Sequence, residues 1–96
     1  MKKRDKKFLN ESLEEFGMVG WSVRTKDDIE WGCDLLSAEL IIKDCNNTIT
    51  LDFDCEKQSH IQKRIDKLET LINSLSDFRD ALVEAKQDIT NKKFYY

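Results

Sequence analysis

The chain has 96 residues and a mass of 11.3 kDa, which is enough for one small domain and excludes a multidomain enzyme. Hydrophobic residues make up 40% and charged residues 36% of the sequence, so the apolar share is sufficient for a folded domain. No apolar run approaches the roughly 20 residues of a membrane-spanning helix. The basic start of the chain is not followed by the apolar stretch of a secretion signal. We therefore expect a single cytoplasmic domain over residues 1–96, with no membrane contact.

The formal net charge of −3 hides an uneven distribution of charge. Residues 1–7 carry five basic and one acidic side chain, whereas residues 27–56 carry nine acidic and one basic side chain. We expect the first segment to be a basic, frayed tip and the second to form an acidic surface. Such a surface repels phosphate, so direct nucleic-acid binding is not expected.

The first expected element is a short helix, because the apolar residues of Phe8–Phe16 share one face at the helical period and Gly17 is a suitable cap. The period then changes to two. Apolar residues alternate over Val19–Val23 and again over Ile29–Cys33, which predicts two strands. A loop or short turn is expected at Asp34–Ser37.

The clearest local signal is a hairpin formed by residues 39–44 and 48–54. Asn46 and Asn47 lie between them, and asparagine tolerates the left-handed conformations of a two-residue turn. This turn places the apolar residues of both strands on one face. The register predicts three pairs, which are Cys45 with Thr48, Ile42 with Leu51 and Leu40 with Phe53.

A long C-terminal helix is predicted from Ile61 to Ile89, because apolar residues recur there at spacings of three and four. Ser59 and Gln62 precede and enter it in the pattern of a capping box. The sequence thus predicts the α+β class, with a small antiparallel meander of about four strands packed on this helix and a short helix at the N-terminus. The expected core consists of Leu40, Ile42, Leu51 and Phe53 against Ile65, Leu68, Ile72 and Leu75.

This helix exceeds the length that strands of about six residues can cover. The C-terminal half would leave an apolar stripe in water, and two-fold dimers commonly cover such stripes. A homodimer through that half is therefore expected, as a short contact, because Arg79 and Lys86 interrupt the heptad of Ile65, Leu68, Ile72 and Leu75. The predicted self-association residues are Phe78, Leu82, Ala85 and Ile89.

No motif for catalysis or cofactor binding is found in the sequence. His60 and Cys55 could form a nucleophile–base pair, but a helix-start histidine and a small apolar cysteine explain both residues. The spacing of Cys33, Cys45 and Cys55 lacks the close pairs of zinc knuckles. No glycine-rich phosphate loop is present. We expect no enzymatic activity, no metal and no cofactor, with a cysteine- or metal-dependent activity as a remote alternative.

The acidic middle has two interpretations. It could dock on a basic surface of a protein target, as proteins that imitate DNA do, or it could be a solvated face that keeps the sheet from aggregating. The residues of the predicted docking face are Asp27, Asp28, Glu39, Asp52 and Asp54.

Residues 68–82, read as LETLINSLSDFRDAL, resemble in style the short orphan accessory proteins of bacteriophages, which pair a small meander with one long helix. This resemblance implies an inhibitor of a host defence or host enzyme, and it implies no functional residue. The sequence therefore predicts a small non-enzymatic protein-binding inhibitor or regulator. The alternative is a structural or assembly subunit that oligomerises through its long helix.

Overall fold

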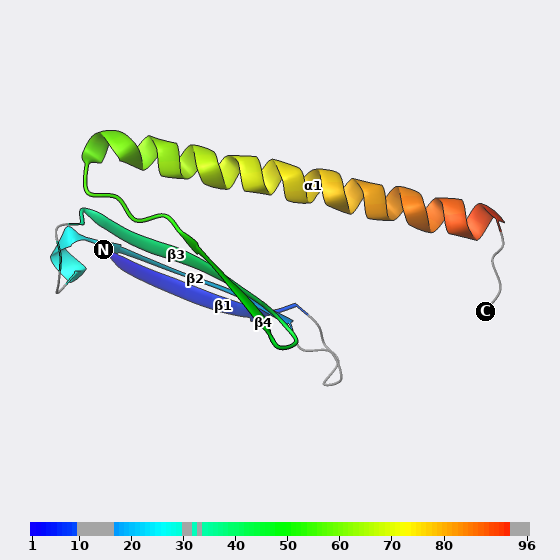
Figure 1. Ribbon diagram of the computed structural model, residues 1–96, viewed down its shortest axis with the longest axis horizontal. Coiled ribbons are helices and arrows are strands. Elements are labelled where there is room, and N and C mark those ends of the chain that lie inside the picture. The colour runs from blue at the N-terminus through cyan, green and yellow to red at the C-terminus, as the bar shows by residue number, and fades with distance from the viewer. Residues whose placement is uncertain (10–16, 30–31, 33, 93–96) are drawn as a thin grey trace. The chain divides into compact units, whose positions relative to one another are not determined.

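The computed structural model describes residues 1–9, 17–29, 32 and 34–92, and the chain divides into two compact units, Met1–Arg64 and Ile65–Tyr96. The first unit contains a four-stranded antiparallel sheet in which each strand pairs with the next along the chain (Figure 1). One long helix follows in the described part of the chain, so the predicted α+β class is confirmed. The elements are β1 (Lys2–Phe8), β2 (Gly17–Thr25), β3 (Leu36–Asp44), β4 (Asn47–Asp52) and α1 (Ile61–Lys92).

Strand β1 replaces the frayed basic tip that the sequence predicts for residues 1–7. It pairs along its whole length with β2, from Lys2 opposite Arg24 to Phe8 opposite Met18. All seven of its side chains are exposed, so the backbone ladder with β2 holds this strand in place. Lysine-rich edge strands need no buried face for that pairing, which is why apolar alternation did not reveal β1.

The predicted short helix over residues 8–16 is not formed in its described part, since Phe8 ends β1 and Leu9 continues the pairing by donating to the Gly17 carbonyl at 2.9 Å. Residues 10–16 lie outside the described residues. The helical turns that the structure does describe before α1 are 3₁₀ turns, η1 (Lys26–Asp28) and η2 (Gln58–His60).

The strand predicted at Val19–Val23 is confirmed as β2, whereas most of the strand predicted for 29–33 lies outside the described residues. Ile29 follows η1 without entering a strand. The loop expected at residues 34–37 is shorter than predicted, because β3 already begins at Leu36.

The hairpin is confirmed, but its turn begins one residue earlier than predicted. Asp44 pairs with Asn47, so the two loop residues are Cys45 and Asn46 rather than the two asparagines. Leu40 consequently faces Leu51, and the whole register shifts by two residues. Since side chains alternate with a period of two, this shift leaves every side chain on its predicted face.

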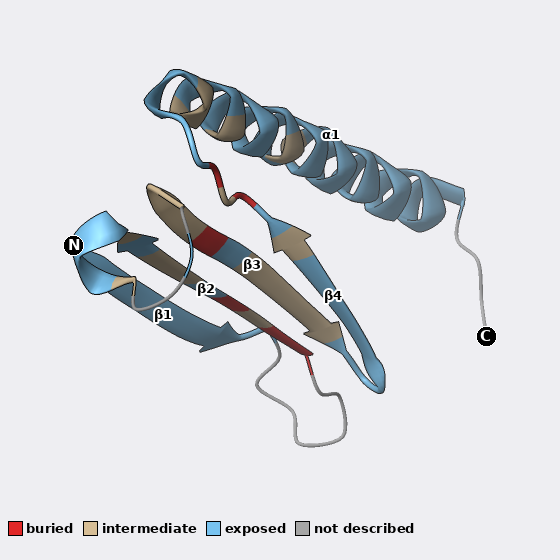
Figure 2. Ribbon diagram, turned by 60° about the vertical axis from the view of Figure 1, so that its left-hand side comes forward, coloured by how far each residue is buried: buried red, intermediate tan, exposed pale blue. Residues whose placement is uncertain are grey.

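The buried apolar residues lie around β2, β3 and the segment after β4 (Figure 2). They are Met18, Ala38, Phe53 and Cys55, each at most 8% exposed. Leu40, Ile42 and Leu51 of the expected core are half-buried, and Phe53 is buried. The expected helix half of the core is not buried, because Ile65, Leu68, Ile72 and Leu75 are 38–53% exposed.

Helix α1 has 32 residues and is therefore about 48 Å long. Its start, Ile61, agrees with the prediction, and its end at Lys92 lies three residues beyond the predicted Ile89. None of its residues is buried.

Candidate functional site

The sheet carries basic side chains at the β1 edge and carboxylates toward the β4 edge. On one face, a row crosses all four strands from Arg4 through Ser22 and Glu39 to Asp52, as the three strand registers require. The basic side chains of β1 lie at one end of this row and the carboxylates at the other. A charge gradient of this kind orients an approaching charged partner.

The structure brings together only part of the predicted acidic docking face. Glu39 and Asp52 are direct cross-strand partners and are exposed. Asp27 and Asp28 lie in η1, beyond the end of β2. Asp54 follows β4 and is half-buried. The docking role of these residues stays a prediction, and only Glu39 and Asp52 form an exposed pair.

Asp54 supports the local fold. Its carboxylate accepts a 2.7 Å hydrogen bond from the backbone N–H of buried Ala38. Burial raises the pKa of the Asp54 carboxyl, and the carboxylates of Asp52 and Asp34 raise it further, while the bond from Ala38 opposes them. The Asp54 carbonyl accepts a 2.9 Å hydrogen bond from Arg64 Nε, which joins the first turn of α1, within the unit Met1–Arg64, to the end of the hairpin.

Asp28 has a partner within the chain. It forms an ion pair with the amino group of Met1 at 2.7 Å, and the hydrogen bond from this amine lowers the pKa of the Asp28 carboxyl. The same amine donates to the Thr25 hydroxyl at 2.7 Å. Asp28 therefore holds the start of β1 beside the end of β2, so its carboxylate is engaged within the protein.

A basic groove of about 280 Å³ lies beside the acidic pair. This groove was not predicted from the sequence, because residues 1–7 were expected to form a frayed tip. The detectable signal was the spacing of Lys2, Arg4 and Lys6, which puts three cations on one face of a strand. The lining residues are Lys2, Lys3, Arg4, Ser22, Arg24 and Glu39.

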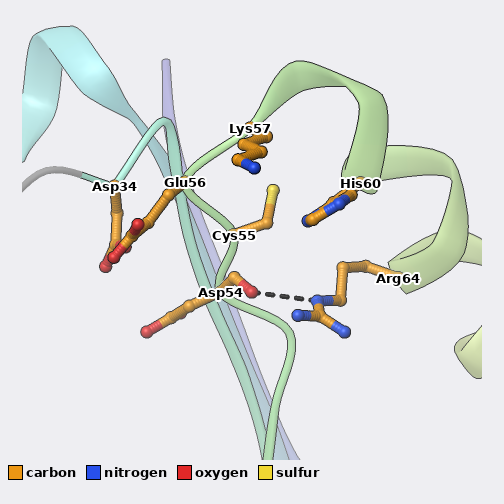
Figure 3. A pocket seen from close by; sticks show the side chains of 7 residues that line it. All are labelled: Asp34, Asp54, Cys55, Glu56, Lys57, His60 and Arg64. Carbon is orange, nitrogen blue, oxygen red and sulfur yellow. Dashed lines mark hydrogen bonds between the residues drawn. The ribbon is translucent and has the colours of Figure 1, made fainter.

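A second pocket, of about 300 Å³, surrounds Cys55 (Figure 3). The predicted nucleophile–base candidates, Cys55 and His60, both line it. The thiol is 4% exposed, and no hydrogen bond joins it to His60 within the described residues. Mixed acidic and basic side chains complete the lining, and they are Asp34, Asp54, Glu56, Lys57 and Arg64.

The two cysteines that the structure describes do not converge. Cys45 is exposed in the β3–β4 turn, whereas Cys55 is buried at the other end of the hairpin, paired with Leu36. Cys33 lies outside the described residues. Among the residues that the structure describes, no group of three or more His, Cys, Asp or Glu side chains could hold a metal ion.

Helix α1 carries a seam of apolar residues in which spacings of three and four alternate without interruption. Five of its seven residues, Leu68, Leu75, Phe78, Leu82 and Ile89, are 38–59% exposed. Ala85 is exposed as well, and Leu71 is half-buried. We call this set the α1 seam, and its members are Leu68, Leu71, Leu75, Phe78, Leu82, Ala85 and Ile89.

The α1 seam includes all four predicted self-association residues. Arg79 and Lys86, which the sequence analysis took as interruptions of a heptad, lie one residue after Phe78 and Ala85 and so flank this seam. If Leu71, Phe78 and Ala85 replace Ile72, Arg79 and Lys86 as one of the two apolar positions of each heptad, no charged residue interrupts the repeat. In this reading the apolar repeat extends over three heptads, a length typical of helix pairing.

Within residues 1–9, 17–29, 32 and 34–92, no helix has both the length and the apolarity needed to cross a bilayer. Comparisons of the chain with protein-family models, curated proteins and solved structures found no match.

Proposed function

We propose that this chain is a small non-enzymatic protein-binding protein, an inhibitor or regulator, whose docking element is the α1 seam. The observation that carries this proposal is the exposure of a continuous apolar seam along about 32 Å of one helix. Exposed apolar patches of this extent mark protein interaction sites. Partners recognise such a helix through anchors spaced by three and four residues.

The pocket around Cys55 supports this proposal less directly. A thiol nucleophile needs access and a base within hydrogen-bond reach. Cys55 is 4% exposed, and its position opposite Leu36 on the apolar face of the hairpin explains its burial. We propose a host-directed target because residues 68–82 resemble in style the accessory proteins of bacteriophages.

Site-specific photocrosslinking in producing cells tests the docking role of the α1 seam. Benzoylphenylalanine in place of Phe78 is expected to form covalent protein adducts, because this side chain is 59% exposed in the middle of the seam. The same group in place of Asp80 or Gln87, on the opposite side of α1, is the matched control and is expected to form none. Equal adducts from both sides, or none from Phe78, would contradict the proposal.

A further inference from the structure

We infer that the partner of the α1 seam is a second copy of this chain, bound antiparallel along the whole helix. This inference rests on the proposed function, because it identifies the occupant of that docking surface. It differs from the short contact expected from sequence, since the seam continues from Leu68 to Ile89.

The seam lies close to the middle of the helix. The midpoint of Ile61–Lys92 lies between Ser76 and Asp77. A two-fold axis through this point overlaps both helices along their full length and pairs six of the seven seam residues in three central layers. These layers are Leu75 with the partner's Phe78, Leu71 with the partner's Leu82, and Leu68 with the partner's Ala85. The seventh seam residue, Ile89, lies opposite the partner's Arg64.

Side-chain size favours this direction over a parallel pair. In a parallel pair, Phe78 would face Phe78 and Ala85 would face Ala85, so one layer would be crowded and another would leave a void. The antiparallel pair matches Phe78 with leucine and Ala85 with leucine. Complementary volumes of this kind are what closely packed interiors require.

The charges beside the seam are compatible with an antiparallel pair. Lys67 and Asp88 each lie one residue before a seam residue, and antiparallel helices bring these two flanks together. Each Lys67 then lies near the partner's Asp88. Within each chain, Asp88 also forms an ion pair with Lys92 at 3.1 Å. In a parallel pair, the corresponding neighbours are Ser74 with Arg79, Ala81 with Lys86 and Asp88 with Lys93, so charge does not distinguish the two directions.

On the other flank of the seam, apolar side chains of one helix lie opposite basic side chains of the partner. Ile72 approaches the partner's Arg79, and Ile65 approaches the partner's Lys86. The long aliphatic stems of arginine and lysine cover apolar side chains while their charged ends remain in water. These contacts provide cover for Ile65 and Ile72, which are 46% and 48% exposed in the single chain.

Sedimentation equilibrium at micromolar concentration tests the inference with the full chain. The expected mass is twice 11.3 kDa. Phe78→Asp with Leu82→Asp should weaken the dimer on the order of a hundred-fold or more, because each places an unpaired charge in an apolar layer. Val83→Asp is the matched control, because Val83 is 51% exposed but lies outside the seam. The dimer of this variant should persist. A monomeric wild-type chain, or a dimer that survives the double substitution, overturns the inference.

Disulfide trapping tests the direction of the pair. In a Cys33→Ser, Cys45→Ser background, chains with Leu71→Cys and chains with Leu82→Cys should cross-link when mixed and not when alone. Cross-linking of each variant with itself would indicate a parallel pair and overturn the inference. If the wild type is monomeric and Phe78 crosslinks a heavier protein in cells, the proposed function stands and the second copy is excluded as partner.

Discussion

Glu39 and Asp52 face each other across β3 and β4, so two carboxylates of like charge occupy one cross-strand pair. Like charges in this position destabilise a sheet. The pair lies at the acidic end of a row that begins with Arg4 on β1. A basic surface on a partner would relieve the repulsion, which is how this pair could serve as the docking face predicted from the sequence.

Asp52→Asn should stabilise the sheet. The asparagine keeps an oxygen that can accept the Asp54 backbone N–H, which Asp52 accepts at 2.7 Å, and it removes the repulsion with Glu39. We expect a gain of roughly 0.2–1 kcal/mol in the free energy of unfolding, measured by urea denaturation. Asp44→Asn is the control, because Asp44 lies opposite uncharged Asn47. A variant less stable than this control would contradict the account.

Phe53→Ala should unfold much of the sheet unit. Phe53 is 8% exposed, and it is one of four buried apolar residues in the described part of the chain. Removal of a buried phenylalanine side chain costs about 3–5 kcal/mol, a large part of the stability of a small domain. Ile49→Ala is the control, since Ile49 shares the same face but is 57% exposed. Thermal melts of the two variants should differ clearly, and similar melting temperatures would show that Phe53 is not central to the core.

Asp54→Asn should change how stability depends on pH. The raised pKa of Asp54 means that the folded state binds this proton more tightly than the unfolded state, so wild-type stability falls as pH rises from 3.8 through the raised value. Asparagine retains an acceptor for the Ala38 N–H and has no such titration. The variant should therefore gain stability relative to wild type between pH 3.5 and pH 7 in urea denaturation. A relative loss over that interval would reverse the sign assigned to Asp54.

Reversal of charge at Asp54 should lower the stability of the fold. Asp54→Lys removes the acceptor of the buried Ala38 N–H and is expected to cost about 1–3 kcal/mol. For this reason, Asp54 cannot test the docking role of the acidic pair. Glu39→Gln with Asp52→Asn is the suitable variant for binding measurements at low salt.

Cys45→Gly should stabilise the β3–β4 turn. Cys45 adopts a φ of 53° as the first of two loop residues, a conformation that costs an L-residue about 1–2 kcal/mol and that glycine adopts freely. Part of this gain is offset by the greater freedom of glycine in the unfolded chain. We expect a net rise of about 0.5 kcal/mol in the free energy of unfolding. A marked loss would indicate that the exposed thiol makes a contact needed for the turn.

The sequence predicted the faces of the hairpin better than its register. Period-two alternation fixes which side chains share a face, and this survived the shift of the turn to Cys45. The asparagine pair suggested the turn one residue too late, because a cysteine with positive φ has no signature in the sequence. The residues lining the basic groove could not be assembled from sequence, since they come together only when β1 pairs with β2.

The apolar periodicity of α1 predicted the helix and its exposed stripe. It did not show which residues form the seam, because Ile65 and Ile72 fit the same seven-residue repeat as Leu71 and Phe78 do. We infer the seam with Leu71 and Phe78, because six of its seven residues are related in pairs about the midpoint of Ile61–Lys92.

The placement of β1 has a practical consequence for handling the protein. Removal of residues 1–8 would turn β2 into an open edge bearing Val19, Trp21 and Val23, without the lysines that discourage strand addition between molecules. Such a shortened chain should form fibrils or precipitates more readily than the intact one. An affinity tag fused ahead of Met1 would also abolish the amine that pairs with Asp28, so a C-terminal tag preserves the sheet better.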